Sequence, residues 1–180
     1  MKVVDTPLPD VLVIEPKVFG DSRGFFLETY NQRAMVEIGI RESFVQDNHS
    51  FSAKNVLRGL HYQVQNPQGK LLRVVTGEIL DVVVDLRRGS SAYGKWRSVR
   101  LSGENKRMIW VPAGFAHGFR VVSETAHVFY KTTDFYAPPH ERTIAWNDPG
   151  LGIDWELDGE PLVSAKDAKA VSFRDAEKFE

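Results

Sequence analysis

The chain has 180 residues, of which 42% are hydrophobic and 26% are charged, and its formal net charge is −1. These values are typical of an ordinary globular protein, and we predict a single domain over residues 1–180. The balanced charge gives no reason to expect a nucleic acid or an anionic membrane surface as a partner. The chain has no cysteine, which excludes disulfides, thiolate catalysis and cysteine metal sites.

The N-terminal residues lack the apolar core of a signal peptide, and no apolar run approaches the length that spans a membrane. The absence of cysteine also suits a reducing compartment. We therefore expect a cytoplasmic protein.

Short strand-like segments separated by turn signals dominate the chain. In chain order, the predicted strands cover 11–14, 71–76, 79–86, 98–102, 108–111, 119–122 and 126–132. Gly77-Glu78 is a hairpin signal between the second and the third of them. One early helix is predicted over Gln32 to Ile38 with Asn31 as its cap, and the charged tail from Ser164 has room for a helical turn or two. Many short strands at regular spacing predict an all-β sandwich or barrel.

Two segments look like the two halves of a metal-site signature of small cupin-type β-barrels, the upstream half without its ligands. They are Arg58-Gly59-Leu60-His61-Tyr62-Gln63 and Pro112-Ala113-Gly114-Phe115-Ala116-His117. A metal-binding barrel would have His-x-His in the first segment, followed by a Glu. Here Gln63 replaces the second His, and no carboxylate occurs before Lys70. We interpret His61 as a base with a nearby cation, and we predict no metal.

In a regular strand, His61 and Gln63 point to one face and Arg58 to the other, unless Gly59 hosts a bulge. Lys70 follows a predicted turn and can return to the same pocket. A neutral histidine can remove a proton near neutral pH, and a cation can hold the negative charge that results. This combination suits proton abstraction beside a ketone. The alternative is a hydrogen-bonded structural histidine.

A general base works better when a third group fixes its tautomer. The candidates for that group are Asp167, Asp81 and Asp85, and the sequence does not choose among them. For Asp167 the alternative is a solvated charge in the tail. Tyr130 shares a predicted strand face with Val128 and can donate a proton from the side opposite the base. Its alternative is an amphipathic core tyrosine.

Further candidates lie in polar or aromatic segments. Arg23 can bind a phosphate, Phe26 can stack on a base and Glu28 can accept hydrogen bonds. The favoured interpretation of this segment is nevertheless a turn into a strand with a surface salt bridge. The segment 46–50 lines a pocket or forms a loop. His117 is predicted to donate a hydrogen bond to substrate or phosphate, and Tyr136 stacks on a planar ligand or packs.

Several blocks of the chain resemble the dTDP-4-dehydrorhamnose 3,5-epimerase family. The matching stretches are Gly20-Asp21-Ser22-Arg23-Gly24-Phe25-Phe26, Gln46-Asp47-Asn48-His49-Ser50, Val56-Leu57-Arg58-Gly59-Leu60-His61-Tyr62-Gln63, Pro112-Ala113-Gly114-Phe115-Ala116-His117-Gly118-Phe119, Tyr130-Lys131-Thr132-Thr133-Asp134, Trp146-Asn147-Asp148-Pro149 and Ser164-Ala165-Lys166-Asp167. They occur in order over nearly the whole chain, and several blocks in register are more specific than any single motif.

The resemblance implies an all-β, cupin-type jelly-roll barrel with a few short peripheral helices, acting as a homodimer with no metal or other cofactor. The implied reaction is epimerisation of dTDP-4-dehydro-6-deoxy-D-glucose at the 3- and 5-positions. The resemblance implies that His61 is the base paired with Asp167, that Tyr130 is the opposite proton donor and that Lys70 steadies the enolate oxygen. Residues matching nucleotide-sugar contacts, some of which come from the partner subunit in this family, are Arg23, Glu28, Gln46, Asn48, Arg58, His117, Glu141 and Lys166. Tyr136 matches the residue that stacks on thymine.

Three other functions compete with this one. A single-position epimerase of a related dTDP-ketosugar uses similar residues, and the sequence does not separate it from the double epimerase. A metal-dependent cupin enzyme is disfavoured by Gln63 and the missing carboxylate. A non-catalytic nucleotide-sugar-binding barrel is disfavoured by the retained set of His61, Lys70 and Tyr130.

Overall fold

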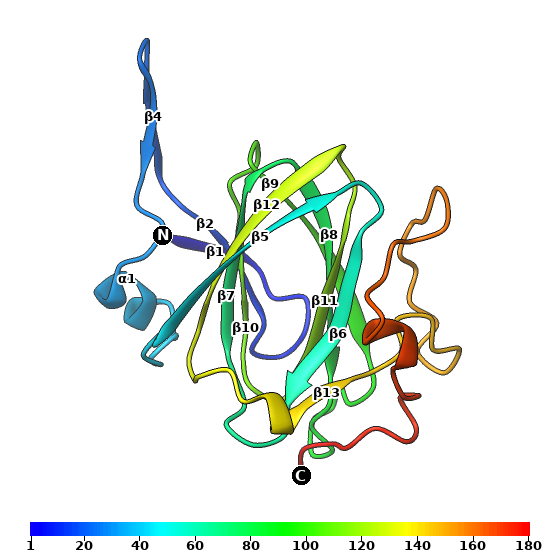
Figure 1. The fold of residues 1–180 in the computed structure, drawn as a ribbon. Coiled ribbons are helices and arrows are strands. Elements are labelled where there is room, and N and C mark those ends of the chain that lie inside the picture. Colours follow the sequence, from blue (N-terminus) through cyan, green and yellow to red (C-terminus); the bar gives the residue numbers. More distant parts are fainter.

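A computed structural model describes all residues from 1 to 180, and it consists of two antiparallel sheets packed face to face with a two-stranded arm (Figure 1). The six-stranded sheet contains, in spatial order, β1 (Lys2–Asp5), β2 (Leu12–Glu15), β10 (Met108–Val111), β7 (Lys70–Thr76), β12 (Thr125–Thr132) and β5 (Gln46–Ala53). The five-stranded sheet contains β13 (Glu141–Thr143), β6 (Leu57–Gln63), β11 (Phe115–Val121), β8 (Glu78–Asp85) and β9 (Trp96–Ser102). The arm is formed by β3 (Val18–Asp21) and β4 (Gly24–Leu27).

The helices are few and short, as the sequence predicted. Helix α1 (Gln32–Glu37) begins after Asn31, whose side chain accepts hydrogen bonds from the next free backbone N–H groups, so the predicted cap is confirmed. The others are the 3₁₀ turns η1 (Pro138–His140) and η2 (Asp167–Lys169). None of these helices is long and apolar enough to cross a membrane.

Most consecutive strands from β5 to β12 belong to different sheets, so the chain crosses repeatedly between the two layers. The hairpin predicted at Gly77-Glu78 is wrong: β7 pairs with β10 and β12, whereas β8 pairs with β9 and β11. Gly77 has a φ of +82° and turns the chain sharply from one sheet into the other. A turn signal marks where the chain reverses, and it does not say whether the flanking strands pair.

The core has two main layers on either side of the five-stranded sheet. Between the sheets, residues such as Leu72, Val83 and Phe119 form one buried cluster. Behind the five-stranded sheet, a second cluster packs strand residues against the C-terminal segment, including Trp155. Strand β8 is covered on both faces, which explains why nearly all of its residues are buried and most of them are apolar. The C-terminal segment is thereby held against the strands that carry the pocket.

A bulge in β6 lies next to the predicted base. His61 pairs with His117 and Arg58 pairs with Phe119, so β6 advances three residues where β11 advances two. Gly59 accommodates the extra residue with a φ of +120°, in the region that favours glycine. The bulge that would bring Arg58 and His61 to one face is therefore confirmed.

We predict that Gly59→Ala disrupts this part of the barrel. A Cβ atom at residue 59 would lie 2.6 Å from the Gly118 Cα and 2.8 Å from the His117 carbonyl oxygen, both of them backbone atoms that cannot easily move. The expected loss in the free energy of unfolding is about 3 kcal/mol, measured by chemical denaturation. Gly89→Ala is the control, because a Cβ there meets no atom within 4 Å. Equal stability of the two variants would contradict the proposed role of the contact.

Candidate functional site

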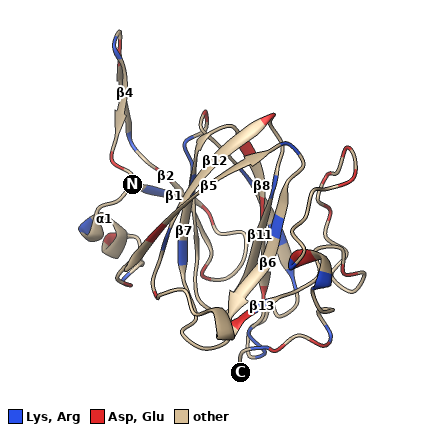
Figure 2. Cartoon of the chain, in the orientation of Figure 1, with Lys and Arg blue, Asp and Glu red and all other residues tan.

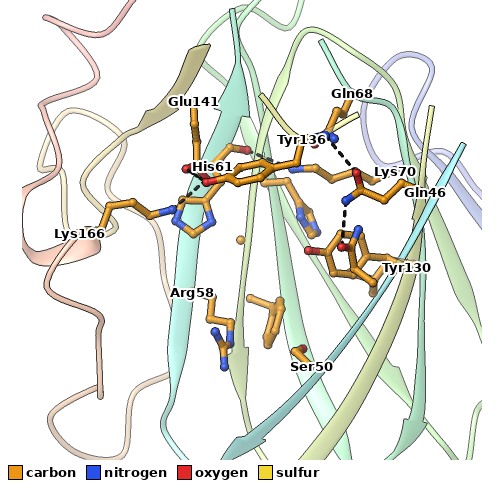
Figure 3. A pocket seen from close by; sticks show the side chains of 15 residues that line it. Gln46, Ser50, Arg58, His61, Gln68, Lys70, Tyr130, Tyr136, Glu141 and Lys166 are labelled. Carbon is orange, nitrogen blue, oxygen red and sulfur yellow. Dashed lines mark hydrogen bonds and ion pairs between the residues drawn. The ribbon is translucent and has the colours of Figure 1, made fainter. Parts of the chain in front are cut away.

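A cavity of about 340 Å³ lies between the two sheets and is lined by 15 residues (Figure 3). Ten of the residues predicted for the site line it: Gln46, Asn48, Arg58, His61, Lys70, His117, Tyr130, Tyr136, Glu141 and Lys166. Figure 2 shows basic and acidic residues interspersed over the fold. The cluster of three cations around the cavity, Arg58, Lys70 and Lys166, is therefore a local feature.

His61 is bound to a buried carboxylate. Its Nε2 atom lies 2.5 Å from Oδ1 of Asp167, which is the first residue of η2 and almost fully buried. Burial is the largest single effect and would raise the pKa of Asp167, but the hydrogen bond with His61 and several smaller contributions together outweigh it, so the pKa lies below its ordinary value. The alternative of a solvated charge in the tail is therefore wrong for Asp167.

The two other candidate aspartates have different partners. Asp81 Oδ2 lies 2.8 Å from Nε2 of His117, and its second oxygen is buried without a hydrogen bond. Asp85 forms an ion pair of 2.8 Å with Arg87. Because His117 is the cross-strand neighbour of His61, the cavity has two adjacent imidazoles, each bound to its own buried carboxylate.

Lys70 begins β7 and projects into the cavity beside the histidines (Figure 3). Its Nζ donates a hydrogen bond of 3.4 Å to the His61 carbonyl oxygen. Burial lowers the pKa of Lys70 to about 8, although the negative charges of Glu141 and Asp81 favour its charged form. At neutral pH the ammonium group is therefore still charged, and it titrates unusually close to neutrality.

Tyr130 lies on β12, on the wall opposite His61 (Figure 3). Regular alternation along β12 turns Tyr130 inward together with the buried Val128, as the sequence predicted. Burial raises the pKa of Tyr130, so its phenol keeps its proton at neutral pH. The cavity thus has a histidine on one sheet and a protonated phenol on the other.

Tyr136, Glu141 and Lys166 form a connected group at one side of the cavity. The Tyr136 hydroxyl donates to one carboxylate oxygen of Glu141 and the Lys166 ammonium donates to the other, each at 2.8 Å. Burial is the largest single effect and would raise the pKa of Glu141, but these two hydrogen bonds and the nearby charges together outweigh it, so the pKa is lowered. Tyr136 itself is half exposed.

Gln63 stands where a metal barrel would have its second histidine, and its amide is used within the protein. Its Nε2 donates to the Asn66 and Phe135 carbonyl oxygens, at 2.7 and 3.3 Å, and its Oε1 accepts from the Ala137 N–H at 2.8 Å. These bonds hold the loop that carries Tyr136. No group of three or more His, Asp or Glu side chains is arranged to hold a metal ion.

Three predicted residues lie away from this cavity. Arg23 and Phe26 are on the β3–β4 arm, which projects away from the two sheets (Figure 1), and Glu28 follows it. The side chain of Arg23 is 87% exposed and forms an ion pair of 2.6 Å with Asp21. This is the surface salt bridge that the sequence favoured for this segment. Phe26 is 70% exposed. Within one chain, the fold does not bring these residues to the cavity.

The cavity also has lining residues that the sequence did not single out as site residues, including Ser50 and Gln68. Ser50 shares a strand face with Gln46 and Asn48, so alternation along β5 would have found it once the segment was known to be a strand. Gln68 lies in the turn before β7, and its amide donates to the Asp134 carbonyl oxygen at 2.8 Å. Nothing in the sequence indicates that contact.

Comparison with known proteins decides the family. The family model described as dTDP-4-dehydrorhamnose 3,5-epimerase matches residues 5–175. The chain belongs to the dTDP-4-dehydrorhamnose 3,5-epimerase family. It is 61% identical to the dTDP-4-dehydrorhamnose 3,5-epimerase of Pseudomonas aeruginosa over 180 residues, which cover 99% of each chain.

Solved structures of epimerases have the same fold. The dTDP-6-deoxy-D-glucose-3,5-epimerase of Legionella pneumophila, solved with dTDP-4-keto-L-rhamnose, aligns with a TM-score of 0.95 at 49% identity, covering 98% of this chain and 94% of that one. A 3′-monoepimerase from Streptomyces bikiniensis, solved with dTDP-quinovose, aligns with a TM-score of 0.86 at 32% identity, covering 93% and 85%. The family resemblance and the cupin-like jelly-roll fold expected from the sequence are confirmed.

Proposed function

We propose that this chain epimerises dTDP-4-dehydro-6-deoxy-D-glucose at carbons 3 and 5 to dTDP-4-dehydro-L-rhamnose, by proton transfers through an enolate and without a metal. The observation that carries the proposal is the pairing of His61 with buried Asp167 on one wall of the cavity, opposite the protonated Tyr130. The high identity to a 3,5-epimerase, against 32% to a monoepimerase, favours reaction at both carbons.

The chemistry starts at the ketone on carbon 4, which acidifies the protons on both neighbouring carbons. Asp167 holds the Nε2–H of His61, so that Nδ1 carries the lone pair and removes the proton. Tyr130 returns a proton from the opposite wall, which inverts the carbon. Repetition of these two steps at the second carbon completes the reaction, and exchange with solvent resets both groups.

Lys70 stabilises the intermediate in this proposal. Removal of the proton places negative charge on the ketone oxygen, and the Lys70 ammonium beside His61 is positioned to hold it. Burial makes that charge more effective, because water does not screen it. Of the remaining cations, Lys166 suits the diphosphate of the substrate.

The proposal predicts that the product formed in heavy water gains deuterium at both carbons that flank the ketone, as measured by mass spectrometry and NMR. His61→Asn should lower kcat by roughly 10²–10⁴-fold, because the general base is lost. His140→Asn, outside the cavity on η1, is the control and should keep normal turnover. Deuterium at one carbon only would instead identify a single-position epimerase.

The lowered pKa of Lys70 predicts a pH dependence. Because the charged form is the active one, kcat/KM should fall as the pH rises through about 8. Tyr130 does not cause this decline, since its pKa is raised and its phenol stays protonated. Lys70→Arg keeps a permanent charge, so any activity it retains should lose this alkaline decline. A decline near the same pH in Lys70→Arg would contradict the assignment.

We also propose a cytoplasmic homodimer in which the arm of each chain completes the cavity of its partner. Arg23 and Glu28 match nucleotide-sugar contacts of the family and Phe26 can stack on a base, yet all three lie outside the cavity of their own chain. The arm further exposes Phe19 and Phe25, by 53% and 60%. A second copy would cover this apolar surface and gain both an aromatic platform and a phosphate-binding cation.

Mixing two inactive variants tests the shared site. One variant carries Arg23→Ala and Phe26→Ala in the arm, and the other carries His61→Asn in the cavity. If arms are exchanged, mixed dimers have one intact site, and equal mixing should restore about a quarter of wild-type activity. The control is the arm variant, with Arg23→Ala and Phe26→Ala, alone at the same total concentration, and it should stay inactive. No recovery after verified subunit exchange would contradict the shared site.

A further inference from the structure

The hydroxyl oxygen of Ser50 is buried and has no hydrogen-bond partner, although the residue lines the cavity. A buried hydroxyl without a partner is unfavourable, and most such groups in proteins are satisfied. The neighbouring inward serine on β5, Ser52, illustrates the usual case, since its oxygen accepts a hydrogen bond of 3.1 Å from Arg58 Nε. The unpaired hydroxyl of Ser50 therefore points to a ligand that the cavity receives.

Ser50 lies beyond the reacting groups, at the end of the cavity near Arg58 (Figure 3). On β5 it is the next inward-facing residue after Asn48, which is the cross-strand partner of Tyr130. Arg58 approaches from the opposite wall, where the bulge at Gly59 turns it inward. Tyr136, the proposed thymine platform, lies toward the other end of the cavity in the same view (Figure 3). The Ser50 end thus suits the sugar rather than the base.

The chemistry of the substrate singles out one sugar oxygen. The ring must stay in place while two of its carbons are inverted in turn, so its anchor has to be a group that neither step moves. The 3-hydroxyl is on a reacting carbon and changes its direction. The 2-hydroxyl is the one ring hydroxyl on a carbon that does not react, and a serine hydroxyl can both donate to it and accept from it.

We propose that Ser50, with Arg58 opposite, binds the 2-hydroxyl of the ketosugar and holds the ring during both epimerisations. This inference rests on the proposed function and adds a specificity-determining residue to it. The Ser50 hydroxyl makes no hydrogen bond within the protein, so it contributes to binding and turnover rather than to folding.

Ser50→Ala tests the inference. We expect kcat/KM for the ketosugar to fall about 10-fold, the usual effect of one lost hydrogen bond. The melting temperature should not fall, because the removed hydroxyl has no protein partner. Ser98→Ala on the exposed part of β9 is the matched control and should change neither quantity. Unchanged kcat/KM in Ser50→Ala, with wild-type turnover intact, would overturn the inference and leave the proposed function standing.

A substrate analogue identifies the bound oxygen. The wild-type protein should prefer the ketosugar over the same compound lacking its 2-hydroxyl by about 10-fold, and Ser50→Ala should lose that preference. Binding of dTDP alone, measured by calorimetry, should be equal in both proteins. Weaker binding of dTDP to Ser50→Ala would assign the hydroxyl to the diphosphate and overturn the inference. Absence of turnover by the wild-type protein would instead refute the proposed function itself.

Discussion

The close contact between the backbones of β6 and β11 at Gly59 and Gly118 is the constraint on which the cavity depends. A side chain at either glycine would collide with the opposite strand, at 2.6 Å in both cases. The bulge at Gly59 shifts the register so that Arg58 and His61 share a face, and it leaves His61 directly across from His117. Without this local irregularity, regular alternation would send Arg58 away from the cavity.

The cavity also depends on burial, which acts on its charged groups in different ways. Asp167 and Glu141 keep lowered pKa values because donors compensate for their loss of water. Lys70 lacks comparable compensation, so burial brings its pKa down to about 8. The cavity and its immediate surroundings therefore contain carboxylates that remain ionised, a phenol that remains protonated and an ammonium group whose pKa is close to neutral pH. This division of protonation states is what an acid–base reaction at a ketone requires.

The position of Gln63 explains how this barrel differs from a metal-binding one. In the cupin-type signature its place belongs to a ligand, but its amide holds the loop of Tyr136 through three hydrogen bonds. The neighbouring His61 is bound by Asp167 and supported by Lys70. The same stretch of strand thus supports the loop of Tyr136 through Gln63 and acid–base chemistry through His61, in the mechanism we propose.

Much of this protein follows from its sequence, because the signals involved are local. Short apolar or alternating runs between turn signals marked seven of the thirteen strands, and Asn31 marked the start of α1. The ordered motif blocks identified the family and the residue types of the cavity. Only the tertiary structure decided which aspartate pairs with His61, since Asp167 lies 106 residues away and burial against β6 depends on the path of the C-terminal segment. It also showed that β7 and β8 do not pair and that the arm projects away from the cavity of its own chain. Strand partners and the direction of an arm are set by the packing of distant segments rather than by neighbouring residues.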